Sequence, residues 1–293
     1  MEKLIINICS PKNENWGDAV FAENLSKELL KLDVSAKIVY IEDWYKNTNY
    51  KISLTISGKF AYKPDQSKRN LLWIISHPEI RTVEELNSYN HVFIASEYFQ
   101  KMVRNDISVP SSVLNQASNF AFNDSKKNKI YDLLFVGNNY YDNFPARKII
   151  YDLDEENRQI LKVIGKNWLK FLPKENILSE FADYKNLSNI YSSAKIVLND
   201  HHEYMRRFGF INNRTFDLAA LRQFQISDYV KGIDLYGIES YKSSDDLNVK
   251  IKDYLNNEKE RNRNEIITNK LCENNTFANV AKEIAKKNIK KEP

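Results

Sequence analysis

The alternation of short apolar runs with segments of helical periodicity constrains the fold of this chain most strongly. In the first part of the sequence the β-rich runs are LIINIC (4–9), AKIVYI (36–41), YKISLTI (50–56), NLLWIIS (70–76), HVFIAS (91–96) and SSVLNQ (111–116). Helical patterns such as AVFAENLSKELLKL (19–32) lie between them. Continuous apolar strands that alternate with helices predict a parallel sheet covered on both faces.

A polar stretch, NDSKKNK (123–129), interrupts this series and is the best candidate for a linker. The series then restarts with IYDLLFVG (130–137), ILKVIG (160–165), AKIVLND (194–200) and QFQISD (223–228), and after Tyr229 the pattern is almost wholly helical. We therefore predict an α/β chain of two doubly wound, Rossmann-like domains facing across a cleft, with a helical C-terminal tail. The expected boundaries are 1–125 and 126–293, and the last helix is expected to cross back onto the first domain.

Composition and charge narrow the classes of function. Hydrophobic residues make up 42% and charged residues 28% of the 293 residues, which is an ordinary globular composition. The net charge of +4 is too small for a strong polyanion-binding field, so no nucleic-acid partner is expected. The cysteines, Cys9 and Cys272, form neither a disulfide framework nor a zinc motif. We expect a cytoplasmic protein, because neither a signal peptide nor a transmembrane run is present; a homo-oligomer stays open.

Open α/β sheets bind ligands at the carboxyl ends of their strands, so the loops after the strands are the places to look for chemistry. The first strand runs into SPKNENWGDAVFAENL, which contains Asn15, Trp16, Gly17 and Asp18. A glycine there lets a ligand approach the backbone, and Asp18 is placed to N-cap the following helix. The spacing is not that of a dinucleotide fingerprint, and a plain helix start remains the alternative.

A histidine stands at the end of the fourth apolar run. In WIISHPEI, His77 is followed by Pro78, which fixes the turn and places the imidazole at a rigid strand end. A purely structural hydrogen-bonding role is the alternative to a functional one.

Cations follow the first strand of the second domain. In LLFVGNNYYDNFPARK, Gly137 and Asn138 form a turn that allows close approach, and Arg147 and Lys148 lie about a helix turn into the next element. Two cations at this point are suited to a diphosphate. An exposed cation pair is the alternative.

Histidines and acids follow the third strand of the second domain. The stretch LNDHHEYMRR contains Asn199, Asp200, His201 and His202, with Arg206 as a further cation. Adjacent histidines point in different directions, and no third ligand stands at a recognised spacing, so no metal site is predicted. Contact of His201 with a polar ligand and plain capping both remain open.

The stretch GFINNRTFDLAALRQFQISD concentrates polar groups between two buried runs. Gly209 permits a turn, Asn212 and Asn213 supply amides, and Arg214 and Asp217 stand at i and i+3 of the following helix. Such a helix start suits a sugar nucleotide, because amides and arginine bind phosphate while the carboxylate accepts from ribose hydroxyls. A surface salt bridge is the alternative.

These motifs together resemble a known family. NWGDAVFAENLSKEL, LLWIISHPE, VFIASEYF, LLFVGN, SAKIVLNDHHEYMRRFGFINNRTFDLAAL and ISD occur in the order seen in CgeB-like bacterial glycosyltransferases, which are group-1 (GT4-like) enzymes with the GT-B fold. The resemblance implies a nucleotide-sugar donor bound by the second domain and an acceptor bound by the first. It makes Asp217 the counterpart of the second glutamate of the EX7E pattern, which holds the donor ribose. The first glutamate has no counterpart in RRFGF, and Asn275 replaces a histidine of the closing segment.

The resemblance also implies the chemistry. Charge builds on the departing diphosphate, and fixed cations stabilise it without a bound metal or other cofactor. Arg147 and Arg214 are the first candidates, with Lys148 and Arg206 behind them, and His77 or Asp18 would be the base of an inverting reaction. We expect a UDP-sugar donor and a glycan, polysaccharide or protein acceptor. A catalytically silent GT-B subunit that binds a partner, or another nucleotide-sugar enzyme such as an epimerase, are the alternatives.

Overall fold

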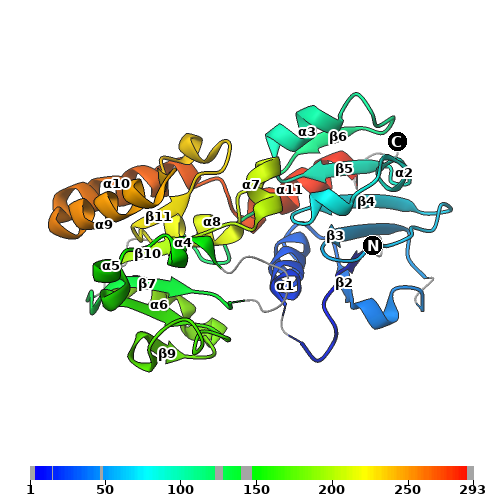
Figure 1. Cartoon of the computed structure of the whole chain (residues 1–293). Helices are drawn as coiled ribbons and strands as arrows, with labels where there is room; N and C mark the ends of the chain where they lie inside the picture. Colours follow the sequence, from blue (N-terminus) through cyan, green and yellow to red (C-terminus); the bar gives the residue numbers. More distant parts are fainter. Residues whose placement is uncertain (1–3, 15, 47–48, 123–127, 140–146, 289–293) are drawn as a thin grey trace. The chain divides into compact units, whose positions relative to one another are not determined.

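The chain folds into two compact units, each built from more than one stretch of sequence (Figure 1). The computed structural model describes residues 4–14, 16–46, 49–122, 128–139 and 147–288. Unit 1 comprises Met1–Asn119, Glu203–Asn213 and Asn274–Pro293, and unit 2 comprises Phe120–His202 and Arg214–Glu273. The chain therefore passes between the units four times, after residues 119, 202, 213 and 273.

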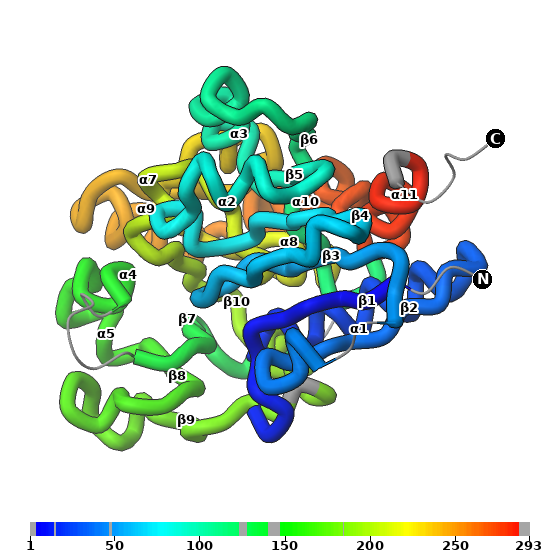
Figure 2. Tube along the Cα trace, turned by 90° about the vertical axis from the view of Figure 1, so that its right-hand side faces the viewer, coloured from blue at the N-terminus to red at the C-terminus, as the bar shows by residue number. Residues whose placement is uncertain are grey.

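Unit 1 is built on a six-stranded parallel sheet with the order β2-β1-β3-β4-β5-β6 (Figure 2). Its strands are β1 (Leu4–Asn7), β2 (Ala36–Val39), β3 (Ile52–Ser57), β4 (Arg69–Ile74), β5 (His91–Ile94) and β6 (Ser111–Val113). The strand order reverses at β1, so the carboxyl ends of β1, β3 and β4 lie along one edge of the sheet. The loops that follow these strands carry the polar residues singled out above for the first domain.

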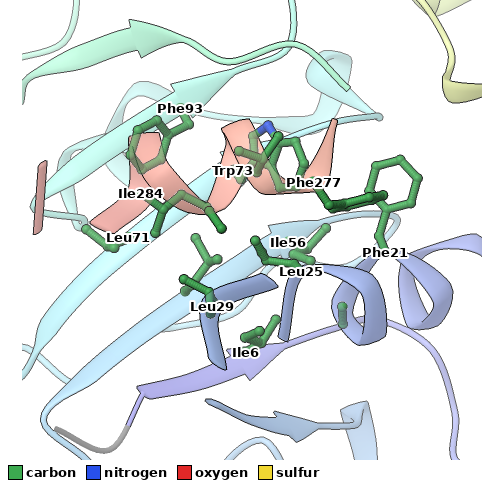
Figure 3. Packing of buried hydrophobic residues seen from close by; sticks show 14 of the residues in the cluster. Ile6, Phe21, Leu25, Leu29, Ile56, Leu71, Trp73, Phe93, Phe277 and Ile284 are labelled. Atoms are coloured by element: carbon green, nitrogen blue, oxygen red, sulfur yellow. The ribbon is translucent and has the colours of Figure 1, made fainter. Parts of the chain in front are cut away.

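Helices cover both faces of this sheet. They are α1 (Gly17–Leu30), α2 (Val83–Asn87), α3 (Glu97–Val103), α7 (Glu203–Phe208) and α11 (Phe277–Asn288). Helices α1 and α11 pack together on one face, where Phe21 and Phe277 meet edge to face with ring centroids 5.0 Å apart (Figure 3). The fully buried Trp73 lies beneath them and donates its indole N–H to the carbonyl of Leu114 at 2.9 Å. The last helix therefore completes the core that the first strands begin.

Unit 2 repeats the architecture with a second six-stranded parallel sheet, ordered β12-β11-β10-β7-β8-β9. Its strands are β7 (Tyr131–Val136), β8 (Leu161–Ile164), β9 (Ile177–Ser179), β10 (Ala194–Asn199), β11 (Gln225–Asp228) and β12 (Glu239–Tyr241). The helices around it are α4 (Lys148–Tyr151), α5 (Glu155–Ile160), α6 (Leu187–Ser192), α8 (Asn213–Ala220), α9 (Ser244–Asn256) and α10 (Glu258–Cys272). No helix in the described parts of the chain is long and apolar enough to cross a membrane.

The predicted fold class is confirmed, with differences in detail. Strands β9 and β12 escape a search for apolar runs, because each has three residues and β12 reads Glu-Ser-Tyr. The segment 203–213, which falls inside the expected second domain, is part of unit 1. The reason is packing, since Met205 and Phe210 are buried in a cluster of unit 1 that includes Leu72 and Phe99.

The loops after β7 and β8 are locked together through backbone contacts. Gly165 has a φ of +148°, and a Cβ built on it would lie 2.1 Å from the carbonyl oxygen of Gly137. That oxygen accepts from the indole N–H of Trp168 at 2.8 Å, and the amide of Lys166 donates to Asn138 Oδ1 at 2.9 Å. The strand end that carries Gly137 and Asn138 is therefore held in one conformation.

Candidate functional site

A buried carboxylate at the end of β10 gathers two arginines. Asp200 follows β10 directly, and its side chain is 2% exposed. Its Oδ1 accepts from Arg147 Nη1 at 3.1 Å and lies 3.9 Å from Arg214 Nη1. The negative charge of Asp200 offsets the repulsion between the two guanidinium groups and so helps to hold both of them beside it.

The backbone and an aromatic ring fix the two guanidinium groups further. Arg147 precedes α4 and donates its Nε–H to the carbonyl of Asn138 at 3.0 Å. Arg214 lies in the first turn of α8, and a Cβ on Gly137 would lie 3.2 Å from its Nη2, so this glycine makes room for the guanidinium. Both groups lie on the Phe135 ring, with their central carbons 5.8 and 5.3 Å from its centroid.

A second acid–base pair lies beside this cluster. Asp228 ends β11, and its Oδ1 lies 2.6 Å from His201 Nδ1, while the His201 amide donates to Oδ2 at 3.1 Å. Both side chains are buried. His201 therefore contacts a carboxylate of this chain, and the two contacts with Asp228 fix the loop after β10.

Burial sets the electrostatics of Asp200. It raises the pKa of the Asp200 carboxyl above its usual range, and the charge of Asp228 acts in the same direction. The positive charges of Arg147 and Arg214 oppose that effect. The two arginines therefore favour the charged form of Asp200, while burial and the charge of Asp228 disfavour it.

A buried amide network holds α8 in place. Asn199 Nδ2 donates to Thr215 Oγ1 at 2.9 Å and to Gln225 Oε1 at 3.2 Å, and Gln225 Nε2 donates to the carbonyl of Thr215 at 2.9 Å. These bonds connect β10 and β11 to the first turn of α8, and thereby position the neighbouring Arg214.

The remaining predicted donor residues take different positions. Lys148 is 53% exposed and forms an ion pair with Asp152, one helical turn onward. Asp217 lies on α8 and is 2% exposed. Arg206 is half-buried on α7, in unit 1, and Asn212 and Asn213 are half-buried at the start of α8. The structure thus brings Arg147, Arg214, Asn138 and Gly137 together, and places Lys148 on another partner.

In unit 1, His77 has an unusual backbone conformation. Its φ of 52° is in the left-handed region, directly before Pro78 and the 3₁₀ turn Pro78–Ile80. Its Nδ1 lies 3.1 Å from Glu79 Oε1, and its ring stacks on Tyr204 of α7 with centroids 4.6 Å apart. A strained backbone that is held by side chains on both sides is typical of functional positions.

The expectation that Asp18 N-caps the first helix is wrong. Helix α1 begins at Gly17 with Trp16 as its N-cap residue, so Asp18 falls inside the first turn. Its Oδ2 instead accepts from the amides of Cys9 and Ser10, at 2.8 and 3.1 Å. Burial raises the pKa of the Asp18 carboxyl. Asp18 therefore fastens the loop after β1 to α1.

Asn15, Trp16 and Gly17 are the other residues predicted on the acceptor side, and the structure describes the last two. Trp16 donates its indole N–H to Glu14 at 2.6 Å on the surface, and a Cβ on Gly17 would meet nothing within 4 Å. Asn15 lies outside the described residues. Among the residues that the structure describes, no group of three or more His, Cys, Asp and Glu side chains is placed to hold a metal ion.

Sequence reasoning missed the acids that organise the site. In the sequence, Asp228 is the end of a predicted strand and Asp200 is one polar residue among several. The signal is their position, because Asp200 directly follows the buried strand AKIVLN and Asp228 ends the buried strand QISD. Phe135 was hidden for a different reason, since an aromatic residue inside an apolar run looks like ordinary core.

Comparisons with known proteins cover this region of the chain. A family model described as glycosyl transferase-like matches residues 146–285. The spore protein CgeB of Bacillus subtilis (strain 168) is 32% identical over 119 residues, which are 35% of this chain and 38% of CgeB. The match therefore spans less than two thirds of that relative.

Solved structures extend the likeness of fold to the whole chain. Sucrose-phosphate synthase from Thermosynechococcus elongatus has a TM-score of 0.70 at 10% identity, with 97% of this chain and 98% of that chain covered. T4 phage BGT in complex with its UDP-glucose substrate has a TM-score of 0.65 at 12% identity, with coverage of 98% and 99%. HepE of Anabaena in complex with UDP has a TM-score of 0.61 at 10% identity, with the same coverage. The resemblance seen in the sequence is confirmed: residues 146–285 match a glycosyl transferase-like family, part of the chain is similar to CgeB, and the whole chain has the GT-B fold.

Proposed function

We propose that this chain is a glycosyltransferase that moves a sugar from a nucleotide-sugar donor, with a UDP-sugar as the first candidate, to a glycan, polysaccharide or protein acceptor. Unit 2 binds the donor and unit 1 carries the acceptor side. The proposal includes a bacterial, cytoplasmic enzyme that needs no bound metal. Free thiols at both Cys9 and Cys272 support the reducing compartment, and the CgeB relative supports a bacterial source.

The observation that carries the proposal is the convergence of Arg147 and Arg214 on Asp200. It lies after β7 and β10, where the strand order of unit 2 reverses, and within the region matched by the glycosyl transferase-like model. Open parallel sheets bind nucleotides at such reversals. T4 phage BGT and HepE, which share the fold, form complexes with UDP-glucose and UDP, respectively.

These residues have the charges that the reaction requires. When the bond from the sugar to the diphosphate breaks, negative charge grows on the leaving oxygens and positive charge on the sugar ring. In the proposal, Arg147 and Arg214 stabilise the leaving diphosphate, because fixed cations in a partly buried site do so without reorganisation. If the reaction inverts the sugar, His77 takes the proton of the acceptor hydroxyl at Nε2, which lies 3.5 Å from the Tyr204 hydroxyl, while Nδ1 lies 3.1 Å from Glu79 Oε1.

A panel of nucleotide sugars tests the function directly. The purified chain is incubated with UDP-, GDP- and ADP-sugars, and release of each nucleoside diphosphate is measured. We expect UDP release from a UDP-sugar, slow with water and faster once a suitable acceptor is added. Tight UDP binding in calorimetry without release from any donor indicates the silent-subunit alternative. Absence of both binding and release contradicts a nucleotide-sugar site.

Asp217 gives a sharper test of the donor site. If its carboxylate accepts from both ribose hydroxyls, then Asp217→Asn weakens UDP binding by about 1–2 kcal/mol and narrows the preference for UDP over 2′-deoxy-UDP. Because Asp217 is 2% exposed, a role within the fold makes a different prediction. In that case the melting temperature falls while the ribose preference stays unchanged. Calorimetry with both nucleotides on both proteins, beside melting curves, distinguishes the two.

A further inference from the structure

The geometry around Asp200 has a consequence for any anion that binds the two arginines. Arg147 and Arg214 each approach the same carboxylate oxygen, and their side chains are 11% and 17% exposed. Asp200 itself is 2% exposed. An anion that binds the outer N–H groups of both arginines therefore places its charge close to a carboxylate that water barely reaches.

We propose that Asp200 is a positioning residue that holds the two arginines together and takes up a proton when a phosphate-type anion binds them. The inference rests on the proposed function for the identity of its natural ligand, a nucleoside diphosphate. Its physical content concerns the anion site alone.

The sign of the effect follows from like-charge repulsion. A bound anion disfavours the charged form of Asp200, so the pKa of this carboxyl is higher in the complex than in the free protein. Binding with proton uptake is favoured at low pH and is lost as the pH rises through the pKa of the complex. Burial already raises the pKa of the Asp200 carboxyl in the free protein. The pH range in which sulfate affinity changes therefore lies above the range expected for an exposed carboxyl.

Other charged groups face Asp200 and must be separated from it. They are Arg147 and Arg214 on the two sides, with His201, Asp228 of β11 and Tyr241 of β12 behind it. The arginines stay charged at any relevant pH. His201 is the group to control for, because it follows Asp200 directly and is paired with Asp228.

Sulfate is the clean probe, because it does not titrate between pH 6 and 8, whereas nucleoside diphosphates do. Calorimetric titration of the whole chain with sodium sulfate, at fixed ionic strength, is expected to show affinity falling by up to tenfold per pH unit somewhere between about pH 5 and 8. Asp200→Asn keeps an acceptor for the arginines but cannot take up a proton. This variant is expected to bind sulfate more tightly at pH 8, with little dependence on pH. His201→Gln is expected to keep the wild-type slope.

Three results overturn the inference. They are a wild-type affinity that does not change with pH, an Asp200→Asn variant with the wild-type slope, and no sulfate binding at tens of millimolar. If Asp200→Asn does not fold, the wild-type protein still decides the question. Enthalpies measured in buffers of different ionisation heat then report proton uptake, and zero uptake throughout this pH range refutes the inference. Proton-linked sulfate binding without turnover of any nucleotide sugar refutes the proposed function and leaves this inference standing.

Discussion

Gly165→Ala is expected to unfold unit 2 or to destabilise it by on the order of 4 kcal/mol. The new Cβ would lie 2.1 Å from the carbonyl oxygen of Gly137, and a φ of +148° is strained for any residue with a side chain. Neither effect is relieved by a side-chain rotation, because the colliding atom belongs to the backbone of the loop after β7. Total domain stabilities are about 5–15 kcal/mol, so a loss of this size is decisive. Urea denaturation followed by tryptophan fluorescence measures it.

Gly17→Ala is the matched control for this substitution. A Cβ at Gly17 meets nothing within 4 Å, and the residue begins α1. We expect its unfolding midpoint to equal that of the wild type or to exceed it slightly, because alanine favours helix. Equal stability of the Gly165→Ala and wild-type proteins would show that the loops after β7 and β8 are not locked as described.

Arg147→Ala and Arg214→Ala are each expected to lower turnover by about 10²–10³-fold and to weaken UDP binding by about 1–3 kcal/mol. Each change removes a cation that the proposal places on the leaving diphosphate. Because Asp200 is buried between them, loss of either arginine also leaves its charge less compensated, and the melting temperature is expected to fall. The remaining arginine still pairs with Asp200, so the fold is expected to survive. Steady-state kinetics and UDP calorimetry give both quantities.

Lys148→Ala is the control for the arginine variants. It removes a neighbouring cation that is exposed and paired with Asp152. Turnover and UDP affinity are expected to stay within about twofold of the wild type, because exposed ion pairs contribute little. If Lys148→Ala lowers turnover as much as the arginine variants do, the diphosphate lies nearer to α4 than proposed.

The sequence predicted the fold more completely than the site, and the reason is physical. Periodicity reports burial, so each long apolar run was found, and the Gly209 turn was predicted from its residue type and has a φ of 71°. A polar residue at a strand end shows its chemistry in the sequence but not its partner. His201 pairs with Asp228, 27 residues later, and Arg147 with Asp200, 53 residues later. Such pairings depend on strand order, which no local pattern contains.

The same limit explains the error at Asp18 and the position of Lys148. A helix start two residues earlier than predicted turned the expected cap into a carboxylate that binds the loop after β1. At the start of α4 in unit 2, Arg147 and Lys148 are adjacent in sequence but differ in burial and in their partners. One is 11% and the other 53% exposed, because only the first falls next to the loop after β10.

The position of α11 affects the order in which the two units can complete their folding during synthesis. The strands of unit 1 are made before those of unit 2, yet the interior of unit 1 includes Phe277, Ala281 and Ile284 from α11. The strands and helices of unit 2 are all made by Cys272, before that helix begins at Phe277. Domains usually complete their folding from the N-terminus onward during translation. In this chain the elements of unit 2 are synthesised before α11, and the nascent first unit keeps an uncovered sheet face until α11 has been made.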